Sequence, residues 1–545
     1  MSTPTDSPTP VPLLALEPPT PFDTCIAWHL HDAYWSQRGP AAWQSGEVPF
    51  YSTSNLATAR QHAALLVALV ADLQHAEHLN PDSEVWVLEA GCGLGLFAAN
   101  LLTALETGPD DHRALLPRIR YLLTDCSETN LRQVLELPRV APWRARGHLV
   151  PALYDLRHPT TITRLDGQPT PPLTLVVCNY VCSVIPQQQL QLNDGTWHEL
   201  LVETRVATEL SAGAFLEHAT RDATRENLLT DLELQMSWRP LDLSTHPIFT
   251  ETHQKILARF TDGLPAATFG YPARYFDFLV AAQSIMVPGG AIITSDYGGA
   301  SREKVRGLRD RRPQTYGNSL AQETCFATFD AFATELGWGL LRTRGNLDSV
   351  HSALVTPELG PNLRAAFELQ FRGILVVDEL LDHTASARHF AALKDFPRAL
   401  RYWLRAAAMD ELNPELRYRI GECAIESGEY ALAITHLLAG HALDPHTFDF
   451  DFMLGRATWL ADQPEEAIRW YELSLSREPH PVTWTNLGVI HFAQKREAHA
   501  WACFETAIAL DPGYPRALEH LTALRELAWQ RQTAVWRETL EAKPD

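Results

Sequence analysis

The sequence has little positive charge for its length. Lys and Arg total 45 against 66 Asp and Glu in 545 residues, which gives a formal net charge of −21. Because such a charge repels phosphate backbones and anionic headgroups, and no run of Lys or Arg is present, neither nucleic acid nor a membrane surface is an expected partner. The sequence also lacks a run approaching the roughly 20 uninterrupted apolar residues of a membrane-spanning helix. These absences predict a soluble protein.

Cysteine is sparse and the amino terminus lacks the features of a leader. The eight cysteines are scattered and form no CxxC pair, so neither a disulfide framework nor a zinc ribbon is indicated. Residues 1–21 are rich in Ser, Thr and Pro, with no basic start and no long apolar core. They predict a disordered tail rather than a secretory signal. Together these features predict a cytoplasmic protein.

A period of 33–34 residues runs through the C-terminal third of the chain. Three residue types repeat in phase with it: Gly421, Gly455 and Gly488; Ala433, Ala467 and Ala500; Pro445, Pro479 and Pro512. The pattern resembles the tetratricopeptide repeat, a helix pair in which small residues let the helices approach each other. We therefore expect a linker helix over 361–384 and an all-α repeat solenoid over 385–545, closed by a capping helix from Pro515 to about Lys543. Such an array binds a protein or peptide partner, although some arrays only build dimers.

Residues 22–360 show a different pattern, in which apolar runs alternate with helical stretches. The expected strands are Val85–Glu89, Tyr121–Thr124, His148–Leu153, Thr174–Cys178 and Ala291–Ser295. Strands separated by helices predict a parallel sheet covered on both faces, which is a Rossmann-like α/β fold. Residues 199–285 show no comparable strand, so we expect a mostly helical insertion there. Long insertions of this kind form lids or substrate walls.

A glycine-rich turn follows the first expected strand. The turn Gly91-Cys92-Gly93-Leu94-Gly95 leads into a helical run, and its glycines let a ligand approach closer than a Cβ would permit. Asp125 closes the next strand, where a carboxylate can accept hydrogen bonds from ribose hydroxyls. A dinucleotide fingerprint would require a small residue where the chain has Leu96. The turn therefore indicates another ribose-bearing cofactor; the alternative is a structural turn without a ligand.

The form Glu89-Ala-Gly91-Cys-Gly93-Leu-Gly95 resembles the first motif of class I S-adenosylmethionine-dependent methyltransferases. Further segments are similar to the MidA-like methyltransferase family: "YLLTDCSETNLRQV" at 121–134, "LVVCNYVCSVIPQQQLQLNDGTWHEL" at 175–200, "GGAIITSDYG" at 289–298 and the lead-in "FYSTSNLATARQHAALLVAL". That family includes a mitochondrial protein arginine methyltransferase that acts during respiratory complex I assembly. The resemblance covers about 22–360 and is weakest over 199–285.

The resemblance implies a site for S-adenosylmethionine. The residues that it places at the cofactor are Glu89, Gly91, Gly93, Gly95, Asp125, Cys126, Asp155 and Asn179. Asp125 would take the ribose hydroxyls, Cys126 would lie near the adenine, and Asn179 would lie where ligands gather at strand ends. Asp155 would either accept the adenine amino group or cap its own loop. Asp296 and Tyr297 would close the site from the next strand.

The chain departs from the family where a guanidinium substrate would bind. The family usually carries acidic residues just after the Asn and again before the Pro, whereas this chain has Tyr180 and Ser183 ahead of Pro186. A guanidinium needs carboxylates for bidentate hydrogen bonding, so the change weakens an arginine substrate and leaves cofactor binding untouched. A nitrogen nucleophile must attack uncharged, and we expect Asp296 or Tyr180 to orient it or take its proton.

These features together predict a methyltransferase that uses S-adenosylmethionine and acts on a protein recruited by its repeats. The expected reaction is N-methylation, with arginine among the candidate side chains. Two alternatives stay open: a cofactor-binding scaffold without catalysis that works through its repeats, and a methyltransferase acting on a small molecule. No metal site is expected, because His75, Glu77 and His78 lack the HExxH order and lie on a pattern typical of an exposed helix.

Overall fold

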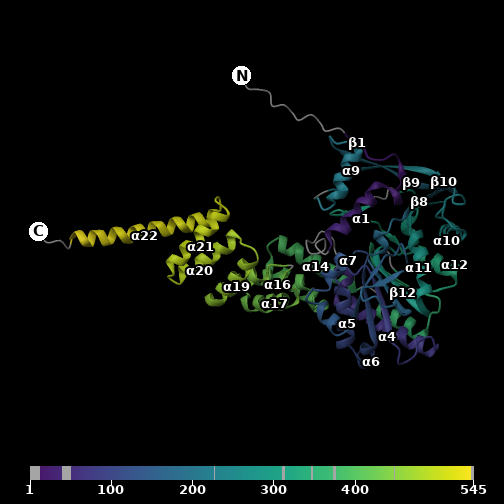
Figure 1. Ribbon diagram of the computed structural model, residues 1–545, viewed down its shortest axis with the longest axis horizontal. Coiled ribbons are helices and arrows are strands. Elements are labelled where there is room, and N and C mark those ends of the chain that lie inside the picture. The colour runs from purple at the N-terminus through teal and green to yellow at the C-terminus, as the bar shows by residue number, and fades with distance from the viewer. Residues whose placement is uncertain are drawn as a thin grey trace, which may run out of the picture. The chain divides into compact units, whose positions relative to one another are not determined.

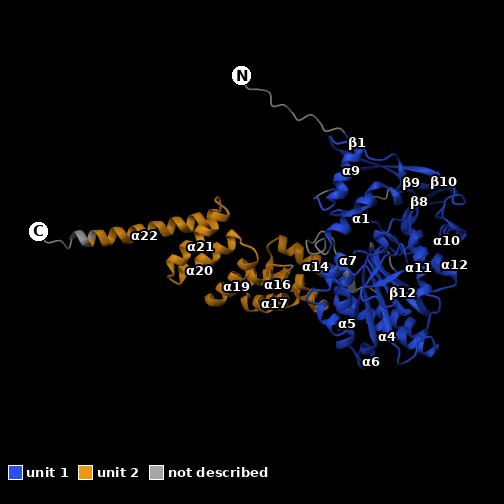
Figure 2. Ribbon diagram, viewed as in Figure 1, with its two compact units in different colours: residues 1–381 blue, residues 382–545 orange. Residues whose placement is uncertain are grey.

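The computed structural model describes residues 13–39, 51–225, 228–309, 313–344, 348–371, 376–446 and 448–541. The chain divides into two compact units, residues 1–381 and 382–545 (Figure 2). The first unit carries β-sheets with covering helices, and the second is built from helices alone among the residues described (Figure 1). The expected α/β part followed by an all-helical part is therefore confirmed.

The larger sheet of the first unit has a Rossmann-like core. Its strands β5, β4, β3, β7 and β12 lie side by side in this order and are all parallel, so counted along the chain they run 3-2-1-4-5. Antiparallel strands extend both edges, with β6 beside β5 and with β17 and then β16 beside β12, while β15 pairs with the end of β12. The strands are β3 (Val85–Ala90), β4 (Ile119–Asp125), β5 (Leu149–Tyr154), β6 (Ile162–Arg164), β7 (Leu173–Asn179), β12 (Met286–Gly299), β15 (Thr324–Cys325), β16 (Gly339–Arg342) and β17 (Asp348–Thr356).

Helices cover both faces of this sheet, which is why its central strands are buried and almost wholly apolar. On one face Trp86 and Leu88 pack in a core with α10, α11 and α12. The helix α4 is long and apolar enough to cross a membrane by composition, but it packs against α5 and α13 and is mostly buried, as core helices are. The helices of this unit are α1 (Ile26–Arg38), α3 (Tyr51–Ser54), α4 (Leu56–His75), α5 (Leu96–Thr107), α6 (Asp110–Leu115), α7 (Glu128–Val134), α8 (Ala141–Ala145), α9 (Ala212–Arg221), α10 (Glu251–Thr261), α11 (Ala273–Ala282), α12 (Thr328–Leu336) and α13 (Pro361–Gln370).

A second, antiparallel sheet stands where the sequence analysis expected a mostly helical insertion over 199–285. That expectation is wrong, because β9, β10 and β11 run through this stretch and α9, α10 and α11 lie between them. The strand β9 begins directly after the two-residue turn Asp194-Gly195, whose φ angles of 46° and 80° suit a tight hairpin. The strands of this sheet are β1 (Leu13–Ala15), β2 (Thr20–Pro21), β8 (Gln188–Asn193), β9 (Thr196–Ala207), β10 (Leu232–Leu241) and β11 (Ala266–Tyr271).

The sheet also corrects the expectation of a disordered tail over residues 1–21. Residues 1–12 lie outside the described part of the chain, but β1 and β2 pair with β9. The short 3-10 helix Phe22–Thr24 and α1 follow at once. Apolar residues of α1, including Trp28 and Tyr34, pack against β9 and α9 in a separate core. Residues 13–38 are therefore part of the first unit.

The second unit is a run of antiparallel helix pairs, and the periodic glycines lie where paired helices touch. A Cβ on Gly421 would lie 2.4 Å from Leu437, one on Gly455 would lie 2.7 Å from Tyr471, and one on Gly488 would lie 2.6 Å from Phe504. The final helix α22 covers α21 with Leu521 and Leu524, as a capping helix should. The helices are α14 (Val376–Ala392), which crosses the unit boundary, α15 (Phe396–Met409), α16 (Pro414–Glu426), α17 (Tyr430–Leu443), α18 (Phe450–Leu460), α19 (Pro464–Arg477), α20 (Pro481–Ala493), α21 (Glu497–Leu510) and α22 (Pro515–Glu541).

Candidate functional site

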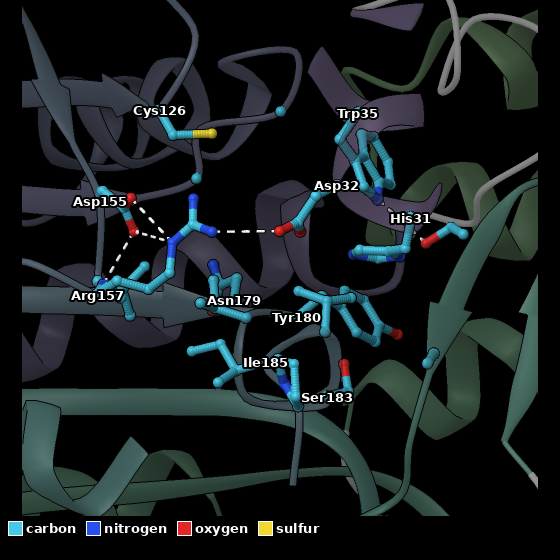
Figure 3. A pocket seen from close by; sticks show the side chains of 18 of the residues that line it. His31, Asp32, Trp35, Cys126, Asp155, Arg157, Asn179, Tyr180, Ser183 and Ile185 are labelled. Atoms are coloured by element: carbon cyan, nitrogen blue, oxygen red, sulfur yellow. Dashed lines mark hydrogen bonds and ion pairs between the residues drawn. The ribbon is translucent and has the colours of Figure 1, made fainter. Parts of the chain in front are cut away.

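A cavity of about 1100 Å³ opens at the carboxyl ends of β3, β4, β5 and β7 (Figure 3). This edge is where ligands bind in open α/β sheets. Nine of the eleven residues proposed from the sequence line the cavity: Glu89, Gly91, Gly93, Asp125, Cys126, Asp155, Asn179, Tyr180 and Tyr297. Gly95 and Asp296 do not.

The glycine turn forms one wall of the cavity, and its three glycines have different structural roles. Gly91, Gly93 and Gly95 all have positive φ angles, of 70°, 54° and 66°, so other residues would be strained there. A Cβ on Gly95 would lie 2.9 Å from Val140 and 3.0 Å from Val134, because this residue is the N-cap of α5 and lies against the end of α7 and the residue before α8. Gly95 therefore serves helix packing, whereas Gly91 and Gly93 face the cavity.

Glu89 lies at the end of β3, beneath the turn. It is 3% exposed, and its carboxyl group accepts a hydrogen bond of 3.1 Å from the hydroxyl of Tyr121. Burial raises the pKa of Glu89 to about 8, so the group is mainly neutral at pH 7 in the chain alone. A ligand cation placed beside it would favour the ionised form.

Asp125 ends β4 on the opposite side of the turn. Burial raises the pKa of Asp125, and one carboxylate oxygen accepts a 2.7 Å hydrogen bond from the backbone N–H of Ser127. The neighbouring Cys126 is exposed to the cavity, and burial of its thiol raises the pKa of Cys126 to about 12. The thiol is therefore protonated and suits packing against a ring rather than nucleophilic attack.

Asp155 follows β5 and does cap its own loop. Its Oδ1 atom accepts a 2.9 Å hydrogen bond from the backbone N–H of Arg157, and the guanidinium Nε lies 3.0 Å from Oδ2. Burial acts to raise the pKa of Asp155, but the hydrogen bonds and charge of Arg157 outweigh it and hold the pKa below its ordinary value. A carboxylate has about four acceptor positions, so these contacts still leave room for an adenine amino group.

Asn179 ends β7 and carries an unsatisfied amide. Both its side-chain nitrogen and its oxygen are shielded from solvent, and neither has a hydrogen-bond partner among the residues described. Burying an amide without hydrogen-bond partners costs free energy. The two atoms are therefore suited to a ligand that accepts a hydrogen bond from the nitrogen and donates one to the oxygen. The next residue, Tyr180, has a φ of 52°, and its backbone N–H donates to the carbonyl of Ser295 at 2.9 Å. The chain thus turns sharply at the cavity wall.

Asp296 lies under the cavity floor and not in its wall. It is fully buried, and its carboxylate accepts 2.8 Å hydrogen bonds from the backbone N–H groups of Ser183 and Tyr297. Burial raises the pKa of Asp296 to about 7. The predicted role in which Asp296 itself faces the substrate is not supported by this position; its two hydrogen-bond donors belong to residues that line the cavity.

The other half of the cavity contains residues that the sequence analysis missed. They come from the first helix and its lead-in, from α11 and from residues 314–322, and include Asp23, Trp28, His29, His31, Asp32, Trp35, Arg274, Asp277, Phe278, Tyr316 and Gln322. Two residues fix α1 in place: His31 Nδ1 accepts from the N–H of Leu320 at 2.9 Å, and Trp35 Nε1 donates to Ser319 at 3.2 Å. The one available signal was the crowding of aromatic residues within α1.

Two of these carboxylates are held by buried or charged partners. Asp23 accepts hydrogen bonds from Gln188 at 3.0 Å and Arg274 at 3.1 Å. Asp277 lies 3.0 Å from Nε2 of His253, a buried imidazole whose Nδ1 contacts the hydroxyl of Tyr271 at 2.8 Å. This half of the cavity therefore combines fixed carboxylates with aromatic rings.

Comparison with known proteins matches a stretch of each unit to family models. Residues 67–327 match a family described as "Putative S-adenosyl-L-methionine-dependent methyltransferase", and residues 384–446 and 482–514 match tetratricopeptide repeats. The narrower MidA-like assignment stays a prediction. No curated protein matches the chain significantly.

Solved structures that resemble part of the chain include two of MamA. The crystal structure of MamA protein is 21% identical, with a TM-score of 0.27, over 30% of this chain and 91% of that one. MamA 41-end from Desulfovibrio magneticus RS-1 is 20% identical, with a TM-score of 0.27, over 30% of this chain and 92% of that one.

Proposed function

Because residues 67–327 form a domain of the S-adenosylmethionine-dependent methyltransferase family and tetratricopeptide repeats follow it, we propose that this protein methylates a protein substrate that its repeats recruit. The observation that carries the cofactor assignment is the unsatisfied amide of Asn179 in a cavity that also holds the glycine turn. Gly91, Gly93, Asp125 and Asn179 are the residues that would hold S-adenosylmethionine. When bound, it supplies an electrophilic methyl group on a sulfonium.

The size of the cavity supports a second occupant. A volume of about 1100 Å³ exceeds the roughly 300–1,000 Å³ typical of a site for one small ligand. Holding two reactants in line is the main task in a direct displacement, and such alignment can supply roughly 7–11 kcal/mol of the barrier. The half lined by α1 and α11 is therefore the proposed substrate side.

The residues on this side suit a cationic side chain. Tyr180 and Ser183 replace the family's acidic residues, yet Asp277 brings a 62% exposed carboxylate to the same cavity from α11. Carboxylates and aromatic faces attract ammonium and guanidinium groups. We therefore keep arginine as a proposed target of N-methylation and add lysine to it. We propose Asp277 as the carboxylate that accepts the released proton. Its side chain is 62% exposed, and its hydrogen-bond partner is the buried imidazole of His253.

The repeats would raise the local concentration of the substrate. Tethering a substrate on the same chain commonly gives an effective concentration in the ~mM range, so the cavity itself need not bind it tightly.

Calorimetric titration with S-adenosylhomocysteine tests the cofactor assignment. Asn179→Leu should weaken binding by about tenfold or more, because a hydrogen bond contributes roughly 0.5–1.5 kcal/mol and the amide can make at least two. The variant should fold normally, since its native amide has no described partner to lose. Asn486→Leu, which removes a hydrogen bond to Tyr471 in the repeats, is the matched control and should bind as the wild type does.

The substrate is tested with S-adenosylmethionine labelled on its methyl group. Label transferred to proteins in a lysate, and lost with Asn179→Leu, would support the proposal. Label recovered only in small molecules would replace the protein substrate with a small one. Binding of S-adenosylhomocysteine without any methyl transfer would favour a scaffold. Failure of the folded wild-type chain to bind it at all would refute the cofactor site.

A further inference from the structure

The helix α1 closes one side of the cofactor cavity, although it precedes the stretch 67–327 that matches the methyltransferase family. Its residues Trp28, His29, His31, Asp32 and Trp35 all line the cavity. The cavity is thus completed by a segment that comes from a distant part of the chain. The contacts that join α1 to the cofactor half of the cavity therefore control how the cavity opens.

Two side chains make that connection: Asn130 of α7 donates a 3.4 Å hydrogen bond to the backbone carbonyl of Trp35, and Arg157 reaches Asp32 at the more exposed side of the cavity. The guanidinium of Arg157 lies between Asp155, at the end of β5, and Asp32, on α1 (Figure 3). Its Nε atom lies 3.1 Å and 3.0 Å from the two carboxylate oxygens of Asp155, and its NH1 atom lies 3.2 Å from Oδ2 of Asp32. All three residues line the cavity, so the bridge runs from one wall to the other.

The bridge lies at the mouth of the cavity and not at its floor. The side chains of Arg157 and Asp32 are 65% and 60% exposed, whereas Asp155 is 30% exposed. Cys126 lies on the same side of the site as Asp155 and Arg157 (Figure 3). A contact this exposed can break and re-form without unfolding the walls, because exposed ion pairs are weak.

We propose that Arg157 and Asp32 form a strap across the mouth of the cavity and that its opening sets the rate at which the cofactor enters and leaves. The proposal rests on the proposed function, since it takes the adenosyl cofactor as the molecule behind the strap. Asp32 does not need to touch the cofactor. It is a positioning residue that holds Arg157 and, through it, joins α1 to the loop after β5.

A strap has a kinetic signature that differs from that of a binding residue. If the bridge is closed both with and without ligand, breaking it raises the association and dissociation rates by the same factor and leaves the dissociation constant unchanged. The strength of an exposed pair predicts a factor of about two to five. Because S-adenosylhomocysteine carries no net charge, salt should act on its exchange mainly by screening the bridge.

The experiment is stopped-flow binding and release of S-adenosylhomocysteine by the full chain at low and high salt. Asp32→Asn should raise both rates about two- to fivefold, with the dissociation constant changed less than twofold. High salt should speed exchange in the wild type and not in Asp32→Asn. Asp32→Glu, which keeps the carboxylate, should restore slow and salt-sensitive exchange. Asp231→Asn is the matched control, because it removes a similarly exposed 3.3 Å pair with Arg225 away from the cavity.

Each contrary result has a distinct meaning. Unchanged rates in Asp32→Asn, with normal binding by the wild type, would overturn the strap and leave the proposed function standing. Tighter binding with an unchanged dissociation rate would also overturn it, because the bridge would then compete with the cofactor for Asp155. No binding by the wild type would remove the cofactor site and the strap together.

Discussion

The substitution Glu89→Gln measures how much the buried carboxyl group lowers the free energy of unfolding as the pH rises. Glu89 is 3% exposed, accepts a hydrogen bond from Tyr121, and forms no salt bridge with any residue in the described part of the chain. Burial raises the pKa of Glu89 from 4.5 to about 8. Glutamine has nearly the same shape and can still accept from Tyr121, but it cannot ionise. The variant therefore removes the ionisation and little else.

The sign and size of the effect follow from the two pKa values. Between pH 4.5 and pH 8 the folded chain holds a proton at Glu89 that the unfolded chain has lost, so stability falls as pH rises through this range. Each pH unit costs about 1.4 kcal/mol, and the whole interval costs about 5 kcal/mol. Burial also raises the pKa of Asp296 to about 7, which acts in the same direction but is common to both proteins and cancels in their difference.

The assay is urea unfolding of the full chain at a series of pH values between 5 and 9. Pulse proteolysis detects the unfolding of the first unit. The difference in unfolding free energy between Glu89→Gln and the wild type should be smallest at pH 5, at about 1 kcal/mol. It should grow by about 1.4 kcal/mol per pH unit up to pH 8, in favour of the variant. Glu233→Gln, at an exposed position on β10, controls for the loss of one negative charge. A difference that stays flat from pH 5 to pH 9 would refute the reasoning.

Three further predictions concern packing, acid stability and capping. Gly488→Ala should destabilise the repeats in thermal unfolding, because the overpacking against Phe504 costs roughly 1–3 kcal/mol and exceeds the gain of about 1 kcal/mol in helix propensity. Gly213→Ala, in α9 with no described atom within 4 Å of the new Cβ, should instead raise stability. Burial lowers the pKa of His62 to about 4, so a proton binds more readily to the unfolded chain than to the folded one. The free energy of unfolding therefore falls as the pH drops from 6.5 towards 4. In urea unfolding, His62→Gln should reduce this pH dependence by about 1.4 kcal/mol per pH unit. Asp72→Ala should cost about 1–2 kcal/mol and speed amide exchange in α13, because its carboxylate accepts from two backbone N–H groups at the start of that helix, at 2.7 Å and 3.1 Å.

The parts of the fold that were predictable are those written in short-range patterns. The strand before Gly91, the turn itself and the strand that ends at Asp125 are consecutive in the chain, and a parallel sheet brings their ends to one edge. The repeats were predictable for the same reason, since each helix pair packs mainly on its neighbours in sequence. In both cases nearby residues decide the outcome.

The second sheet shows why other parts were missed. The strand β10 alternates apolar and polar residues, which is typical of a strand with one face exposed, and Asp194-Gly195 is a strong signal for a hairpin. Both signals lay within the sequence and were overlooked beside the stronger apolar runs of the main sheet. The strand β1 carried no such signal, because three residues form a strand only where β9, nearly 200 positions later, offers an edge.

The sequence by itself determined the two kinds of unit, the glycine turn with its following acid, and the match of residues 67–327 to a methyltransferase family model. Only the tertiary structure decided which carboxylates reach the cavity. Asp296 stands in a motif and yet is buried beneath the floor, whereas Asp32 and Asp277 stand in no motif and line the wall. The physical reason is that whether a side chain faces the cavity or the interior depends on which segments pack against its helix or strand. In this chain, the segments that pack there come from parts of the sequence that lie far apart.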